Sequence, residues 1–437
     1  FRAPLAQLLA VRHGLWQCRA AVPPARMSTR TLSSSPTGLA RNRQPLTVLQ
    51  LIPELNTGGA ELSAIEVCAA LTGRGDRCFV ASQGGRLEPE LRAAGGTLLP
   101  FPAKTKLPWA LRANARKLVT LVKSLGVDII HARSRAPAWS GLWAARWANV
   151  PFVTTYHGAY AERGPAKRLY NSVMARGDIT IANSAYTRDL ILSRYATPPE
   201  RVRVIHRGVD LTAFDQAAIS DEARSELRAA WGLAPEDRVI LQAARLTDWK
   251  GQHVVIDAAA AFLSQQATVG DRANWIVVLA GDAQGREAYR QGLIDHATRL
   301  GIGDAVKLVG HCPQIATALA IADVTVVAST EPEAFGRAAA EAQAVGCPVI
   351  ATNIGAPPET VRGQPDIPAD ERTGWLIPPN DPAELSTALA AAAALTPAER
   401  TAWQVRAREH IIARFSTTRL QEATLAIYDE LISRRPA

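Results

Sequence analysis

Two successive series of alternating strand-like and helix-like segments constrain the fold of this chain more than any other feature. In the first series, short apolar runs typical of buried strands cover residues 47–53, 127–131, 151–156, 178–182 and 203–205. In the second series, such runs cover residues 239–243, 275–280, 306–309, 323–328 and 348–351. Longer segments with helical spacing of apolar residues separate them. Strands that alternate with helices predict parallel sheets.

The helical segments complete the predicted organisation. They cover residues 59–71, 251–265, 285–300, 313–321, 335–345 and much of 382–435. Because a chain of 437 residues exceeds what one core usually serves, and because residues 208–220 interrupt the alternation, we expect two Rossmann-like α/β domains. Their boundaries are predicted at 46–207 and 208–415, with parallel sheets facing across a cleft. Residues 416–437 are expected to form a helix that packs back on the first domain.

Composition excludes several classes of protein. With 47% apolar and 20% charged residues, the chain is neither largely disordered nor collagen-like. Its purely apolar runs are far shorter than the roughly 20 residues of a membrane-spanning helix. The five cysteines lack CxxC spacing, which argues against a disulfide framework or a structural zinc site and favours the cytoplasm.

Charge is distributed unevenly along the chain. Residues 1–45 contain seven arginines and no acidic residue, residues 46–207 carry a net charge of +11, and residues 208–437 carry −9. The basic tail, 1–45, is expected to be disordered. Its composition fits a transit-type presequence, but we favour upstream sequence read through the true start, because Met27 lies inside it.

Three loops that follow predicted strands contain residues suited to binding a phosphorylated ligand. Gly58 and Gly59 allow a backbone to approach a ligand before a helix N-terminus, which favours anions. Arg245 and Lys250 flank a turn and can neutralise a diphosphate from two sides. A plain glycine turn and a solvated basic loop are the alternative interpretations of these two loops.

The third loop is the most specific, because Glu333 and Glu341 are eight residues apart, with Glu341 about two turns into a helix. A carboxylate there can accept paired hydrogen bonds from vicinal hydroxyls, and the N–H groups at the helix start, from Gly336 onward, can meet phosphate oxygens. The alternative is a helix with an acidic first turn. His157, at another strand end, can donate to a substrate hydroxyl or can be a packed structural histidine.

Taken in order, these motifs resemble glycosyltransferase family 4, the retaining GT-B enzymes that use nucleotide-sugar donors. The resemblance covers residues 47 to about 430. It is supported by IHRGVD at 205–210, LAGD at 279–282, VGH at 309–311 and TGWLIPP at 373–379. More narrowly, the chain resembles bacterial members that build lipopolysaccharide or other envelope glycans.

The resemblance implies roles for the residues of the three loops. Arg245 and Lys250 match the pair that holds the donor diphosphate, and Glu341 matches the residue that grips the nucleotide ribose. Glu333 matches the acid beside the donor sugar. The other positions expected at the donor are Gly58, Gly59, His157, Phe335, Gly336 and Arg337.

Some implications concern the reaction itself. The chain contains no Asp-x-Asp pair, so we expect no metal and no cofactor, with Arg245, Lys250 and a helix N-terminus stabilising the departing diphosphate. Retention through a front-face route, in which the leaving phosphate helps to deprotonate the acceptor, is implied by the family. The sequence departs from the family at Ala356 to Glu359, where APPE replaces a Gly-x-Pro-Glu pattern, so the contacts of that loop stay open.

In this architecture the basic first domain binds the acceptor. Two basic loops suggest an anionic glycan or lipid-linked acceptor, or docking on the anionic inner face of the cytoplasmic membrane, and a solvated basic surface is the alternative. The candidate acceptor-binding residues are Arg133, Arg135, Tyr160, Arg163, Lys167 and Arg168. We find no nucleic-acid-binding motif and expect no nucleic-acid partner.

Two other functions share this fold or donor. A nucleotide-sugar epimerase would need the donor but no acceptor, and a non-catalytic scaffold would only bind the sugar nucleotide. A dinucleotide oxidoreductase is disfavoured because no GxGxxG follows the first strand.

Overall fold

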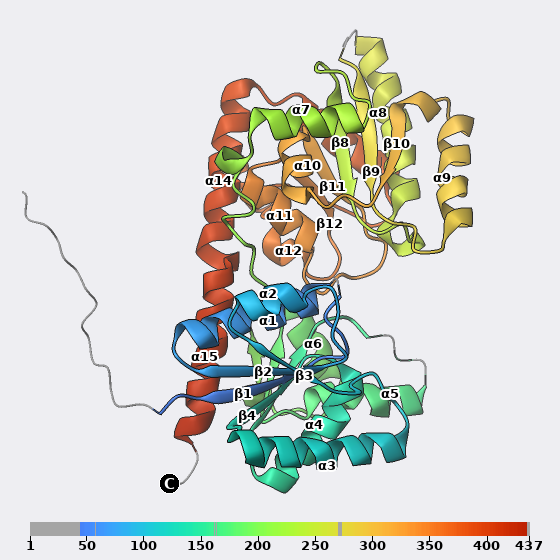
Figure 1. Cartoon of the computed structure of the whole chain (residues 1–437). Coiled ribbons are helices and arrows are strands. Elements are labelled where there is room, and N and C mark those ends of the chain that lie inside the picture. Colours follow the sequence, from blue (N-terminus) through green and yellow to red (C-terminus); the bar gives the residue numbers. More distant parts are fainter. Residues whose placement is uncertain (1–43, 57, 161, 163, 270–272, 435–437) are drawn as a thin grey trace, which may run out of the picture. The chain divides into compact units, whose positions relative to one another are not determined.

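A computed structural model describes residues 44–56, 58–160, 162, 164–269 and 273–434, so the predicted tail at 1–45 lies almost wholly outside the described residues. The first sheet is parallel and seven-stranded, in the order β3-β2-β1-β4-β5-β6-β7 (Figure 1). Its strands are β1 (Thr47–Leu51), β2 (Arg77–Ser82), β3 (Thr97–Pro100), β4 (Ile129–Ala132), β5 (Phe152–Tyr156), β6 (Ile179–Ala182) and β7 (Val202–Val204).

The second sheet is also parallel and has six strands in the order β10-β9-β8-β11-β12-β13. Its strands are β8 (Arg238–Ala243), β9 (Trp275–Ala280), β10 (Val306–Gly310), β11 (Val324–Val327), β12 (Val349–Thr352) and β13 (Trp375–Ile377). Two parallel α/β sheets confirm the predicted fold class.

Helices connect the strands and cover both faces of each sheet, as parallel sheets require. Those of the first sheet are α1 (Gly59–Gly73), α2 (Glu88–Ala93), α3 (Pro108–Leu125), α4 (Arg135–Ala148), α5 (Pro165–Ser172) and α6 (Ala185–Arg194). Those that follow are α7 (Asp221–Ala230), α8 (Gln252–Val269), α9 (Glu287–Arg299), α10 (Ile315–Ile321), α11 (Arg337–Val345), α12 (Pro357–Thr360), α13 (Pro382–Ala393), α14 (Pro397–Phe415) and α15 (Thr417–Ser433).

Alternation along each central strand separates two cores per sheet. In β1, Leu49 packs in a cluster with residues of α3 and α4, whereas its neighbour Val48 packs in another with residues of α1 and α15. In β8, Val239 belongs to a cluster with α11 and α14, and Ile240 to one with α8 and α13. Successive side chains of a strand point to opposite faces, so the central strands β1 and β8, apolar on both faces, are buried between two helical layers.

Every predicted strand and helix has a counterpart in the structure, apart from differences at the ends, but three strands and the helices α7 and α12 have no predicted counterpart. The strands β2, β3 and β13 were not predicted. β3 has only four residues, TLLP, and no buried side chain, and β13 has three, WLI. Such short segments carry too few apolar residues for a periodic signal.

The C-terminal helices connect the second sheet to the first. Val209 and Ser416 form an isolated β-bridge at the start of α15, which then packs against α1. Leu420, Ile427 and Tyr428 of α15 join the core of the first sheet.

A buried polar network lies where α15 meets the first sheet. The ring of His131, at the end of β4, is hydrogen-bonded through Nδ1 to the hydroxyl of Tyr428 at 2.6 Å and through Nε2 to Thr155 Oγ1 at 2.7 Å. Burial lowers the pKa of His131 well below its ordinary value, so the ring is neutral at pH 7. Both ring nitrogens are therefore satisfied without charge.

We predict that Tyr428→Phe lowers the free energy of unfolding by about 1–3 kcal/mol, because it leaves a buried nitrogen of His131 without its partner. Urea unfolding followed by circular dichroism measures this. Tyr186→Phe is the matched control, since the Tyr186 hydroxyl makes no hydrogen bond to another described residue. Equal stability changes in the two variants would contradict the prediction.

Candidate active site

A cavity of about 740 Å³ lies at the carboxyl ends of the strands and is lined by residues of both sheets' loops. Ligands of open parallel sheets bind at these ends. The cavity brings together every predicted donor-site residue. These are Gly58, Gly59, His157, Arg245, Lys250, Glu333, Phe335, Gly336, Arg337 and Glu341.

Lys250 and Glu333 form an ion pair inside this cavity. Lys250 Nζ lies 2.6 Å from Glu333 Oε1, and the two side chains are only 17% and 11% exposed. The Lys250 ammonium also lies 4.2 Å from the centroid of the Trp249 ring, and Ser329 donates a hydrogen bond to Glu333. The lysine and the carboxylate therefore hold each other in place at the cavity wall.

Arg245 is the other predicted cation, and it differs from Lys250 in its environment. Its side chain is exposed and lines the cavity, and it forms no side-chain hydrogen bond or ion pair with another described residue. Hydrogen bonds to the backbone fix the loop between Arg245 and Lys250, because Leu246 N donates to Asp282 O and the side-chain Nε2 of Gln252 donates to Arg245 O. The guanidinium of Arg245 is thus available to a ligand.

The helix α11 begins at the same wall. Gly336 precedes it in the left-handed region, at φ 79°, which favours glycine. Phe335 is buried and packs on Phe415, with ring centroids 6.0 Å apart, so the aromatic ring anchors the loop from beneath. Free N–H groups and the positive end of the helix dipole are thereby presented to the cavity.

Glu341 lies one turn beyond Arg337 on α11, and the two form an ion pair. Burial raises the pKa of Glu341, and the neighbouring Arg337 opposes this shift. The carboxylate is 9% exposed, so it lines the cavity in a fixed orientation.

Arg207 lines the cavity and was not among the predicted site residues, although it lies within the motif at 205–210. A Cβ on Gly59 would lie 1.5 Å from Arg207 Nη1, so a larger residue at 59 would displace the guanidinium from its present position. Burial lowers the pKa of Arg207 to about 10, and Arg337 adds to this effect. The group stays charged at pH 7 and provides a cation on the first-sheet side.

His157 is oriented by Arg207. Arg207 Nη2 donates to His157 Nδ1 at 3.2 Å, and because a guanidinium has no acceptor, the neutral ring carries its proton on Nε2. Burial lowers the pKa of His157 well below its ordinary value, and the cations of Arg207 and Arg133 add to the shift. Nε2 is shielded from solvent and has no hydrogen-bond partner in the described chain, so this N–H can donate to a bound ligand.

Glu359, in the loop that departs from the family pattern, contacts the loops of the first sheet. Its carboxylate accepts hydrogen bonds from the backbone N–H groups of Ala185 at 2.7 Å and Tyr186 at 2.8 Å. These groups form the N-terminus of α6, where negative charge is favoured. His206 Nε2 lies 3.0 Å from the same carboxylate, so Glu359 links the two halves of the chain beside the cavity.

The first of the two basic loops predicted to bind the acceptor, at residues 131–135, is mostly buried. Arg133 is only 3% exposed, and its Nε donates to Gln50 Oε1 at 2.5 Å. His131 and Ala132 belong to β4 and are fully buried. Arg133 is therefore turned into the protein rather than toward solvent, because Gln50 on the neighbouring strand β1 pairs with its guanidinium.

The other acceptor candidates lie around α5 and do not line the cavity. The Arg135 guanidinium stacks 4.1 Å from the Tyr160 ring centroid and donates to Asn171. Lys167 lies over Tyr170, and Arg168 donates to the carbonyl of Arg194. Arg163 lies outside the described residues.

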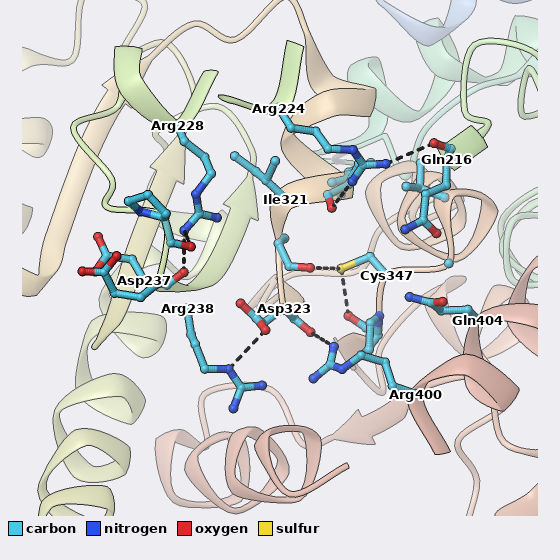
Figure 2. Close-up of a pocket in the computed structure, with 18 residues that line it drawn as sticks. Gln216, Arg224, Arg228, Asp237, Arg238, Ile321, Asp323, Cys347, Arg400 and Gln404 are labelled. Atoms are coloured by element: carbon cyan, nitrogen blue, oxygen red, sulfur yellow. Dashed lines mark hydrogen bonds and ion pairs between the residues drawn. The ribbon is translucent and has the colours of Figure 1, made fainter. Parts of the chain in front are cut away.

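A second cavity, of about 520 Å³, lies at the opposite ends of β8, β11 and β12. Figure 2 shows its arginines turned toward protein groups. Arg224 donates to the carbonyl of Ala320, Arg400 to that of Asp323, and Arg238 Nε to the Asp323 carboxylate. These bonds stabilise the amino-terminal edge of the sheet. The three arginines are thus paired with protein groups, so their presence in this cavity does not indicate a ligand.

The pKa of Glu359 predicts how its contacts depend on pH. Burial raises this pKa, but hydrogen bonds from His206 and from the backbone of Tyr186 and Ala185 outweigh burial, so the net shift is below the ordinary value of 4.5. A carboxyl with a lowered folded pKa contributes stability above its unfolded pKa and loses it as the pH falls through the folded pKa.

We therefore predict that Glu359→Gln lowers the free energy of unfolding by about 1–3 kcal/mol at pH 7, and that this difference shrinks as the pH falls below 4.5. Urea unfolding over a pH series measures it. Glu371→Gln is the control, because its ion pair with Arg362 is exposed. A difference that does not change with pH would contradict the assignment.

Comparisons with known proteins agree with this geometry. Residues 57–213 match Glycosyltransferase Family 4, and residues 223–410 match Glycosyl transferases group 1. A D-inositol 3-phosphate glycosyltransferase of Jonesia denitrificans is 33% identical over 58% of this chain and 61% of its own length. One from Catenulispora acidiphila is 32% identical over 70% of this chain and 72% of its own.

Solved structures resemble the whole fold. A glycosyltransferase of Rickettsia africae matches with a TM-score of 0.80 and 30% identity, over 90% of this chain and all of that one. Anabaena HepE in complex with UDP and glucose matches with a TM-score of 0.73 and 25% identity, over 88% of this chain and 99% of that one. The predicted GT-B fold is confirmed, and this chain belongs to glycosyltransferase family 4.

Proposed function

We propose that this chain transfers a sugar, with retention and without a metal ion, from a nucleoside-diphosphate donor to a glycan or lipid-linked acceptor. One observation carries the proposal. Arg245, Lys250, Glu333 and Glu341, from separate loops and a helix, line the same cavity as the N-terminus of α11.

The charge of the cavity suits a diphosphate. Five basic residues, Arg86, Arg207, Arg245, Lys250 and Arg337, face three acidic residues, Asp282, Glu333 and Glu341. The excess of positive charge would stabilise the leaving diphosphate as the bond to the sugar breaks. On this proposal, Lys250 shares its charge between Glu333 and the phosphate, and Glu341 binds the ribose hydroxyls.

The reaction would proceed on one face of the sugar. The bond between the anomeric carbon and the phosphate oxygen breaks while the acceptor oxygen bonds to the same face. The acceptor proton passes to the departing phosphate oxygen. His157 would hold a sugar hydroxyl through Nε2–H, which is otherwise without a partner, and Glu333 would lie beside the sugar.

The acceptor is proposed to be anionic and to belong to envelope polysaccharide or lipopolysaccharide synthesis at the inner face of the cytoplasmic membrane. Arg86 and Arg207 give the first-sheet wall of the cavity a basic character that favours this. A second candidate is a soluble phosphorylated polyol, because the curated relatives are D-inositol 3-phosphate glycosyltransferases.

We predict that Lys250→Ala lowers the rate of sugar transfer about 100-fold, through loss of one preorganised charge at the leaving group. UDP-sugars are the first donors to test, with product followed by mass spectrometry. Lys307→Ala, in β10 of the same sheet, is the control and is expected to retain activity. A rate for Lys250→Ala within a few-fold of wild type would count against the role of Lys250.

We predict further that the product keeps the anomeric configuration of the donor, which NMR of the purified product reads directly. Inversion would refute the front-face route. A parallel incubation of donor alone tests the two alternatives, because an isomerised sugar nucleotide would identify an epimerase. Binding with neither transfer nor isomerisation over a panel of acceptors would favour a scaffold.

A further inference from the structure

A basic and aromatic surface lies away from the cavity, on α3 and the loop before it. Between residues 101 and 127 the chain has six basic side chains and no acidic one. All six are exposed. They are Lys104, Lys106, Arg112, Arg116, Lys117 and Lys123.

Large apolar side chains are exposed among these cations. Trp109, in the first turn of α3, is 71% exposed, and Leu107 beside it is 51% exposed. Trp147 on α4 and Leu169 on α5 are 46% and 58% exposed. Single exposed apolar residues are ordinary, but these four are a majority of the seven large exposed hydrophobic residues in the described part of the chain.

Contacts between helices make this a continuous surface, which we call the α3 face. The Arg112 guanidinium lies 5.9 Å from the Trp147 ring centroid, and Ser140 of α4 donates to the carbonyl of Leu111 on α3 at 2.9 Å. Trp139 of α4 donates to the carbonyl of Tyr170 on α5 at 3.2 Å. α3 therefore packs on α4, which contacts the first sheet, and α4 is tied to α5 by the Trp139 hydrogen bond. Figure 1 shows α3 at the outer side of this region.

Two carboxylates near this layer are already paired. Glu54 binds Lys104 at 2.5 Å, and Asp178 binds Arg146 at 2.9 Å. Within the described residues, the cations at 106, 112, 116, 117 and 123 form no ion pair. Their positive charge is directed outward, beside an indole that is mostly in solvent.

We propose that the α3 face docks on an anionic lipid bilayer. Tryptophan, with its apolar ring and polar N–H, suits the membrane interface, and lysine and arginine stems reach anionic headgroups beside it. Among the helices that the structure describes, none has the length and hydropathy of a membrane-spanning segment. This proposal adds a lipid bilayer as a partner of the chain. It rests on the proposed function in one respect only, namely that a lipid-linked acceptor would be held in the same membrane.

The test is co-sedimentation of the full chain with vesicles, in the absence of donor and acceptor. Vesicles of phosphatidylcholine are compared with equimolar phosphatidylcholine and phosphatidylglycerol. Each basic residue near such a surface contributes about fivefold in binding, so Arg116→Gln with Lys117→Gln is expected to weaken it about 25-fold. Trp109→Ala is expected to weaken it about tenfold, because the indole no longer leaves water.

The control variants remove two positive charges, or one exposed apolar side chain, from the second half of the chain, away from the α3 face. Arg299→Gln with Arg414→Gln removes two exposed arginines of the second half, and Ile412→Ala removes a 44% exposed side chain of α14. Both are expected to bind anionic vesicles as wild type does. Circular dichroism of each variant establishes that it folds.

Three outcomes would overturn the proposal. These are no binding to anionic vesicles, equal binding to both vesicle types, and loss in the charge variant without loss in Trp109→Ala. The last would indicate general attraction to polyanions, including nucleic acid. The vesicle assay contains no substrate. A lack of vesicle binding therefore does not bear on sugar transfer, and a lack of sugar transfer does not bear on vesicle binding.

Discussion

The ion pair between Lys250 and Glu333 is the interaction on which the rest of the site depends. It joins the loop after β8 to the loop after β11, two neighbouring strands of the second sheet. A mostly buried cation next to a mostly buried carboxylate is costly to separate, so the pair restrains both loops at the wall where α11 begins. A diphosphate entering the cavity would meet a lysine that is already positioned and does not need to be ordered.

The first sheet contributes in a different way. Its loops bring Arg207, His157 and the glycine turn to the same cavity, and the absence of a Cβ at Gly59 leaves room for the guanidinium of Arg207. Glu359 then holds the N-terminus of α6 and His206 from the second half. Charged groups thus both line the cavity and connect the loops on its two sides, so mutations in the connecting groups are expected to affect positioning as well as stability.

Sequence patterns predicted the features that have a local physical signature. Alternating apolar segments predicted the two parallel sheets, and loops at strand ends predicted which residues gather in one cavity. Arg133 shows the limit of this approach. A charged residue directly after an apolar strand predicts the start of an exposed loop. The Arg133 guanidinium is nevertheless buried, because it donates a hydrogen bond to Gln50 on the neighbouring strand. Such a partner is distant in sequence and leaves no local pattern.

The same limit applies to Arg207, Glu359 and the α3 face. The first two act through contacts with residues 50 or more positions away, and the exposure of Trp109 depends on how three helices pack. The domain boundary between residues 207 and 208 stays a prediction. So do the individual roles of the site residues, because the structure shows where they lie and a role is defined by the reaction.

The most direct measurement of the central claim is calorimetric binding of a nucleoside diphosphate and of its monophosphate, in the presence of EDTA, with the base chosen by a thermal-shift screen. We predict that the diphosphate binds without a divalent ion and binds clearly tighter than the monophosphate. Equal affinities, or binding of the diphosphate only after Mg²⁺ is added, would contradict the claim that cationic side chains and a helix N-terminus hold the diphosphate.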